Sequence, residues 1–78
     1  MSIVTNVAVF FAVNPDEELT AQDIGVKWGV NPNNVGQSLR YGTAKGWVAS
    51  TKRPNPERPT KKIVFYTAGP RLLKEIGK

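Results

Sequence analysis

The sequence predicts a small α+β domain, mainly helical, in which three helices precede an antiparallel strand pair and a short closing helix. Three observations lead to this fold class. Apolar residues recur at helical spacing near the start of the chain, a short segment containing glycine separates two further helical stretches, and strand-like alternation begins after Gly46. The length of 78 residues is enough for one domain, residues 1–78, but not for two.

The first helix is predicted over residues 3–13. Its apolar residues recur close to helical spacing, at Ile3, Val7, Phe10 and Phe11. The helix should end before Asn14-Pro15, because a residue that precedes proline is disfavoured in the α region. This apolar stretch is too short to cross a bilayer and lacks the basic segment of a signal peptide, so we expect a core helix and no membrane partner.

The second helix is predicted over residues 21–28. Thr20 suits the N-cap position, and Asp23 lies three residues further on, where a capping box needs an acceptor side chain. Gly29 follows the last helical residue, where a left-handed C-cap favours glycine.

The third helix is predicted over residues 32–45. Asn31 is a good N-cap, and Pro32 occupies the first helical position, where its missing N–H costs nothing. Val35, Leu39 and Gly42 should face the core, and Gly46 should end the helix. Because the turn before this helix is only three or four residues long, the second and third helices should cross steeply.

The rest of the chain is predicted to form a hairpin and a closing helix. Alternation after Gly46 indicates strands over residues 47–52 and 62–67, joined by a proline-rich loop over residues 53–61. Thr67 is expected to cap a last helix over residues 68–76, in which Pro70 falls in the first turn.

Composition restricts the function. The chain has no cysteine and no histidine, which removes disulfides, thiolate metal sites and the commonest general base. We therefore expect no enzyme, metal or cofactor, and a reducing, cytoplasmic location. Residues 40–78 carry ten lysines and arginines against two acids, whereas residues 1–39 carry one lysine against four acids. Such an asymmetry is typical of a protein that binds polyphosphate, although it also fits a solvated basic face without a partner.

In this order of elements, the sequence resembles the winged helix-turn-helix family. The segment 19–24 is similar to the start of that family's second helix, residues 29–35 to the turn and the beginning of its recognition helix, and residues 45–48 to the passage into its first wing strand. The resemblance covers residues 3–77 and implies a three-helix core, a β-hairpin wing and a short C-terminal helix. It also implies double-stranded DNA as the partner, with helix 32–45 in the major groove and the wing on the minor groove or phosphates.

The candidate DNA-binding residues come from these two elements. The outward face of helix 32–45 should present Asn33, Asn34, Gln37, Ser38, Arg40 and Tyr41, followed by Lys45 near its end. Asn and Gln amides pair with adenine edges, and the backbone N–H of Asn33 could donate to a phosphate. The wing contributes Lys52, Arg53, Asn55, Arg58, Lys61 and Lys62. Arg53 and Arg58 are candidates for a narrow A·T-rich minor groove, whereas the lysines suit phosphates.

Alternatives stay open at this point. The prolines and charges of the wing could serve only to blunt a hairpin tip against aggregation. The aromatic residues expected in the core are Phe10, Phe11, Trp28, Trp47, Phe65 and most of Tyr66, which argues against a single-strand stacking platform. A small nucleoid-associated transcriptional regulator, of the size of a phage or mobile-element product, is the first hypothesis. The alternative is a winged-helix adaptor or inhibitor that binds another protein, and a homodimer is compatible with either.

Overall fold

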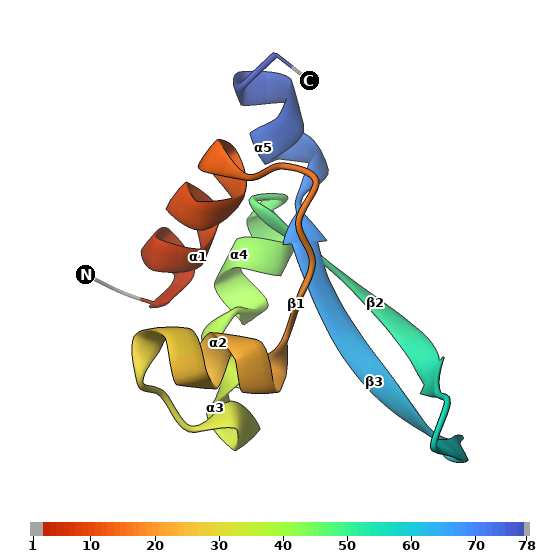
Figure 1. Ribbon diagram of the computed structural model, residues 1–78. Helices are drawn as coiled ribbons and strands as arrows, with labels where there is room; N and C mark the ends of the chain where they lie inside the picture. The colour runs from red at the N-terminus through yellow and green to blue at the C-terminus, as the bar shows by residue number, and fades with distance from the viewer. Residues whose placement is uncertain (1–2, 78) are drawn as a thin grey trace.

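The computed structural model describes residues 3–77, apart from the side chain of Pro59. Within this range it is a small α+β structure with a three-stranded antiparallel sheet (Figure 1). The elements in chain order are α1 (Ile3–Val13), β1 (Leu19–Thr20), α2 (Ala21–Trp28), α3 (Pro32–Ser38), α4 (Arg40–Lys45), β2 (Val48–Asn55), β3 (Arg58–Ala68) and α5 (Pro70–Glu75). This architecture is compatible with a winged helix.

The sheet joins the hairpin to the helices. Its strand order is β1-β3-β2, and β3 therefore pairs with both of the other strands. Strand β1 is only two residues long and pairs Leu19 with Tyr66 and Thr20 with Phe65, near the base of the hairpin. Beyond this base, β2 and β3 continue away from helices α1 to α4 as a free two-stranded arm (Figure 1).

The predicted ends of α2 and the start of α3 are confirmed. Thr20 and Asp23 form a reciprocal capping box, in which the Thr20 hydroxyl accepts from the Asp23 N–H at 3.1 Å and the Asp23 carboxylate accepts from the Thr20 N–H at 3.0 Å. Gly29 ends α2 with φ of 67°, a left-handed conformation that favours glycine. Asn31 caps α3, and Pro32 is in its first turn.

A single helix over residues 32–45 is a wrong prediction, because the structure divides it at Leu39 into α3 and α4. Leu39 has ψ of 2° and is only 1% exposed, so its backbone leaves the helical region while its side chain stays in the core. Gly36 and Gly42 lower the helix propensity of this stretch by about 1 kcal/mol each relative to alanine. With so little local preference, packing decides where the helix bends.

The hairpin differs from the prediction as well. The structure has no loop over residues 53–61: β2 runs to Asn55, β3 starts at Arg58, and a turn at residues 56–57 joins them. Proline is tolerated here because Pro54 lies on the edge strand β2, and Pro59 lies in the part of β3 that β1 does not cover. The register shift after Pro54 accommodates extra residues of β3 near the tip.

The closing helix is shorter than predicted. Helix α5 covers residues 70–75 rather than 68–76, and its N-cap is Gly69, so the prediction that Thr67 caps it is wrong. Thr67 instead belongs to β3, where it pairs with Ala49. The strand continues because Val48 and Ala68 are both buried and face each other across the hairpin base. Pro70 does fall in the first turn of α5.

The core lies where α1, α2, α3 and the hairpin base meet. Its fully buried side chains are Val7, Phe11, Ile24, Val35, Leu39 and Val48. Of the aromatic residues predicted to be in the core, Phe11 and Tyr66 are buried, and Phe10, Trp28 and Trp47 are half-buried around it. Phe65 is half-buried too, but it does not pack against the core. Across residues 3–77, the helices are all too short to cross a membrane.

The steep turn between α2 and α3 depends on a close approach at Gly25, which provides a first test. A Cβ added at Gly25 would lie 2.7 Å from the Val30 carbonyl oxygen and 2.9 Å from Cγ of Pro32. We expect Gly25→Ala to lower the free energy of unfolding by about 1 to 3 kcal/mol, as overpacking does. Urea denaturation monitored by circular dichroism measures this change.

Gly36→Ala is the matched control. A Cβ at Gly36 would meet only the Tyr66 hydroxyl, at 3.5 Å, so the substitution should instead stabilise the protein by about 0.5 to 1 kcal/mol through helix propensity. Equal effects of the two substitutions would contradict the described contact between α2 and the start of α3.

Candidate nucleic-acid interface

Helix α3 has one buried and one polar face. Val35 is fully buried, and the other side chains along the helix are exposed to solvent. The exposed face carries amide and hydroxyl groups from Asn33, Asn34, Gln37 and Ser38, and α3 contains no acidic residue. These groups can donate and accept hydrogen bonds without a charge of their own.

Strand register places two lysines on the side of the hairpin that faces α3. Ser50 pairs with Tyr66, Lys52 with Val64, and Pro54 with Lys62, and directly paired residues share one face of an antiparallel sheet. Tyr66 marks this face as the inner one, because its hydroxyl lies 3.5 Å from the position that a Cβ of Gly36 in α3 would take. Lys52 and Lys62 therefore project from the α3 side of the hairpin, and both are exposed.

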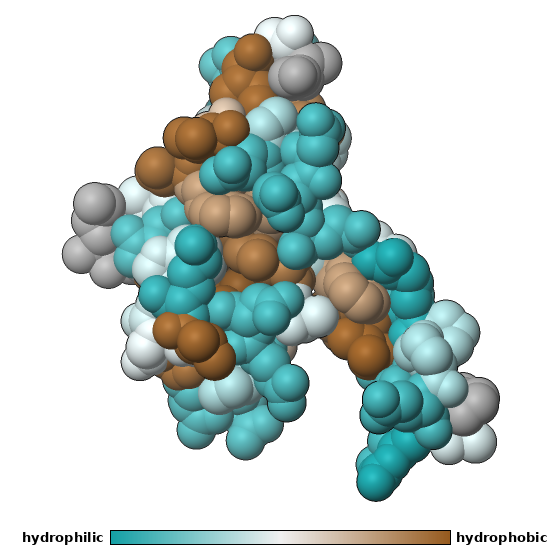
Figure 2. All heavy atoms as spheres, viewed as in Figure 1, coloured by the Kyte–Doolittle hydropathy of each residue, from teal (hydrophilic) through white to brown (hydrophobic). Residues whose placement is uncertain are grey.

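A hollow separates the hairpin from the helices. It has a volume of about 400 Å³, and its lining combines the start of α2 with the hairpin through residues Thr20, Ala21, Gln22, Asn55, Lys62, Ile63, Val64 and Tyr66. Figure 2 shows the molecule notched at this place, with hydrophilic surface at the ends of both lobes. Helix α3 does not line this hollow but adjoins it at Gly36, which lies next to the Tyr66 hydroxyl. We call the exposed face of α3 together with Lys52, Lys62 and the Tyr66 hydroxyl the concave face.

The hairpin tip carries the remaining predicted wing residues. Arg58 and Lys61 are exposed where the strand register is irregular. Asn55 is half-buried, and its side-chain oxygen accepts a hydrogen bond from the Glu57 N–H at 2.9 Å. Asn55 thus stabilises the turn at the hairpin tip, whereas the sequence predicted only a DNA contact for it.

The structure does not bring Arg53 to the concave face. Its guanidinium lies 3.7 Å from the centre of the Phe65 ring and forms an ion pair with the Glu18 carboxylate. Phe65 is adjacent to Tyr66 in β3, so it lies on the opposite, outer side of the sheet. Arg53 consequently spans the outer side of the sheet toward the turn that follows α1, instead of pointing away from the hairpin as a free minor-groove arginine would.

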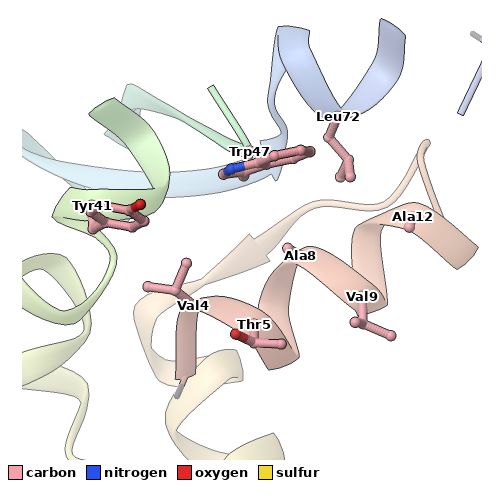
Figure 3. A pocket seen from close by; sticks show the side chains of 8 residues that line it. All are labelled: Val4, Thr5, Ala8, Val9, Ala12, Tyr41, Trp47 and Leu72. Atoms are coloured by element: carbon pink, nitrogen blue, oxygen red, sulfur yellow. The ribbon is translucent and has the colours of Figure 1, made fainter. Parts of the chain in front are cut away.

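Tyr41 and Lys45 also lie apart from α3. Tyr41 lines a groove along α1, together with Trp47 and with Leu72 of α5 (Figure 3). The Nζ of Lys45 is 5.6 Å from the centre of the Tyr41 ring, so this lysine accompanies it. Arg40 is exposed at the start of α4, directly after the break at Leu39. The break in the predicted helix therefore divides the predicted reading residues between two surfaces.

The Asn33 N–H is already engaged. It donates to the side-chain oxygen of the N-cap residue Asn31 at 3.0 Å. The expectation that this N–H donates to a phosphate is therefore wrong. The exposed side chain of Asn33 is the part of the residue that a ligand can contact.

The sequence predicted Tyr66 only as a core residue, but the structure also places it at the candidate site. It is 6% exposed, yet it lines the hollow and its hydroxyl faces α3. Burial raises the pKa of the Tyr66 hydroxyl above its ordinary value, so the group remains a neutral hydrogen-bond donor at physiological pH. The alternation of Tyr66 with Val64 and Lys62 was the available signal, because it put a buried ring and an exposed lysine on the same strand face.

Comparison with known proteins adds no assignment. A scan against protein-family models, a search of curated proteins and a search of solved structures found no match to this chain. Among residues 3–77, no three histidine, cysteine or acidic side chains are grouped so that they could hold a metal ion.

The raised pKa of Tyr66 leads to a second prediction. The folded state favours the neutral hydroxyl, because the pKa of Tyr66 is higher there than its unfolded value of about 10. This difference stabilises the fold below pH of about 10, and the stabilisation is lost as the pH rises through the folded-state pKa. The free energy of unfolding should therefore fall more steeply above pH of about 10 in the wild type than in Tyr66→Phe. Urea denaturation across the alkaline range measures both slopes, and identical slopes would contradict the burial of this hydroxyl.

Proposed function

We propose that this protein binds double-stranded DNA as a winged helix-turn-helix regulator of transcription, through the concave face. One observation carries the proposal: the Tyr66 hydroxyl lies next to Gly36 of α3, and Tyr66 shares its face of the hairpin with Lys52 and Lys62, so the polar helix adjoins the basic side of the hairpin. A helix with a polar face fits the major groove, and a neighbouring basic arm can follow the phosphate backbone next to it.

In this proposal, α3 reads bases. Asn34 and Gln37 are exposed and carry amides that can pair with the N6 and N7 atoms of adenine. Neither residue has a hydrogen-bond partner among the side-chain contacts of the described residues, so both amides are free to meet a base edge. Arg40, just beyond the break, suits a phosphate at the edge of the groove.

The hairpin positions the protein on the backbone. It holds five lysines and arginines, Lys52, Arg53, Arg58, Lys61 and Lys62, against one acid, Glu57. Because Arg53 is paired with Glu18, Arg58 becomes the arginine best placed to enter an A·T-rich minor groove from the tip. The other exposed bases contact phosphates, whose binding carries no sequence information.

An adaptor that binds another protein is the second candidate. It is favoured by exposed apolar side chains outside the concave face, among them Val9 at 56% and Val13 at 73% exposure on α1. These residues lie on another element than α3 and the hairpin, so separate substitutions can test the two functions.

Salt dependence tests the backbone contacts. With about four phosphate contacts from exposed bases, the logarithm of the association constant should fall with the logarithm of salt concentration at a slope of about −4. Lys52→Ala combined with Lys62→Ala should weaken binding to every duplex and reduce that slope by about two units. Fluorescence anisotropy titrations with a labelled duplex at several salt concentrations measure the slope.

Lys27→Ala combined with Lys74→Ala is the control of equal charge. Lys27 lies over Phe10, with its Nζ 4.8 Å from the ring centre, and Lys74 is on α5, so neither belongs to the concave face. This pair should leave the slope near its wild-type value. If both double variants lose the same amount, the protein binds through its general charge and the concave face has no special role.

Base reading by α3 is a separate prediction. Gln37→Ala should cost about 1 to 3 kcal/mol of binding free energy on a preferred duplex and little on random duplexes, because a base contact matters only where that base is present. Competition titrations with a duplex selected from a random library measure the difference. Equal losses on selected and random duplexes would assign Gln37 to backbone contact.

A further inference from the structure

None of the 11 residues of helix α1 is charged, and most of them are apolar. Its exposed positions are Thr5, Val9 and Val13, which follow one another at intervals of one helical turn. The side chain of Val9 is 56% exposed and that of Val13 is 73% exposed. A solvent-facing helix normally carries polar and charged residues on this face, so α1 presents a face suited to contact with another apolar surface.

An apolar groove adjoins this face. Val4, Ala8 and Ala12 of α1 form one wall, and Tyr41, Trp47 and Leu72 form the other (Figure 3). The groove has a volume of about 330 Å³. Because the alanine side chains on α1 are small, another helix backbone can approach α1 closely along its length.

We propose that the occupant is a second copy of this chain, whose α1 packs antiparallel to α1 across a two-fold axis near Val9. Such a contact is self-complementary, because each α1 lies against the α1 and the groove of the other copy. The absence of charge on α1 means that no like charges meet at the axis.

The charges around α1 favour an antiparallel copy over an unrelated apolar helix. Lys45 accompanies Tyr41, and this part of α4 lies at the start of α1, because a Cβ at Gly42 would be 3.0 Å from the Val4 side chain. The other end of α1 leads into the exposed acids Asp16 and Glu17. Antiparallel packing brings the acids of each copy toward Lys45 of the other, so the same attraction occurs twice.

The area that a stable dimer must bury requires both walls of the groove to take part in the contact. A stable two-chain contact buries about 800 Å² per chain, out of a total surface of 5382 Å² here. One face of α1 is too small for this, and the contact must extend over Tyr41, Trp47 and the start of α5. Trp47 is half-buried, and the guanidinium carbon of Arg71 lies 4.9 Å from the centre of its ring. In the dimer this ring would become buried.

This inference does not depend on DNA binding. If both hold, each dimer carries two concave faces, which the two-fold axis relates to one another. If only the dimer holds, the chain associates whether or not a duplex is present.

Sedimentation equilibrium without DNA tests the dimer. The wild type should show a mass that rises from one chain to two with concentration, whereas Val9→Asp should remain at one chain, since two carboxylates would meet at the axis. Val26→Asp is the matched control, because Val26 is 87% exposed on α2, outside the groove. It should dimerise as the wild type does.

A charge exchange keeps the test independent of folding. Val9→Asp and Val9→Lys should each be monomeric alone, and an equimolar mixture should form a dimer of one chain of each kind. A wild type that stays monomeric at every concentration overturns the proposal. So does a dimer that persists in Val9→Asp, that is lost equally in Val26→Asp, or that the mixture fails to restore.

Discussion

The arrangement of this protein depends on how the base of the hairpin is held against the helices. Tyr66 is buried there, pairs with Leu19 of β1 and Ser50 of β2, and brings its hydroxyl close to Gly36 of α3. On the outer side of the same sheet, Arg53 lies on the Phe65 ring and pairs with Glu18. The inner side of the hairpin base is therefore fixed to β1 and α3, and its outer side to the turn before α2. The tip extends freely. This attachment sets the distance between α3 and the two lysines on which the proposed interface rests.

Local signals made much of the fold predictable. The capping box of Thr20 and Asp23, the left-handed Gly29 and the Asn31-Pro32 start of α3 each depend on residues within a few positions of one another. The predicted ranges 3–13 and 21–28 are also the ranges of α1 and α2. In the same way, the inward positions Val35, Leu39 and Gly42 followed from helical spacing alone, because burial of one face is set by the local period.

Other features arise from contacts between distant residues, which a linear pattern does not contain. Proline density suggested a long loop, yet the strands continue through Pro54 because β2 is an edge strand, and that depends on the strand order. Arg53 looked like a free wing residue, and its partner Glu18 lies 35 positions earlier. The break at Leu39, which turns Tyr41 toward α1, follows from tertiary packing where helix propensity is weak. The two-residue strand β1 is too short to show any alternation.

The central claim is that α3 and the inner side of the hairpin form one DNA-binding face. The most direct measurement is a titration of the isotope-labelled protein with a short A·T-rich duplex, followed by nuclear magnetic resonance of the backbone and side-chain amides. We predict that the largest shifts fall on the amides of Asn34 and Gln37 and on the backbone of Lys52 and Lys62, while signals of the α1 residues change little. Shifts confined to α1 and α5, or no shifts at salt concentrations where basic proteins bind duplexes, would contradict the account.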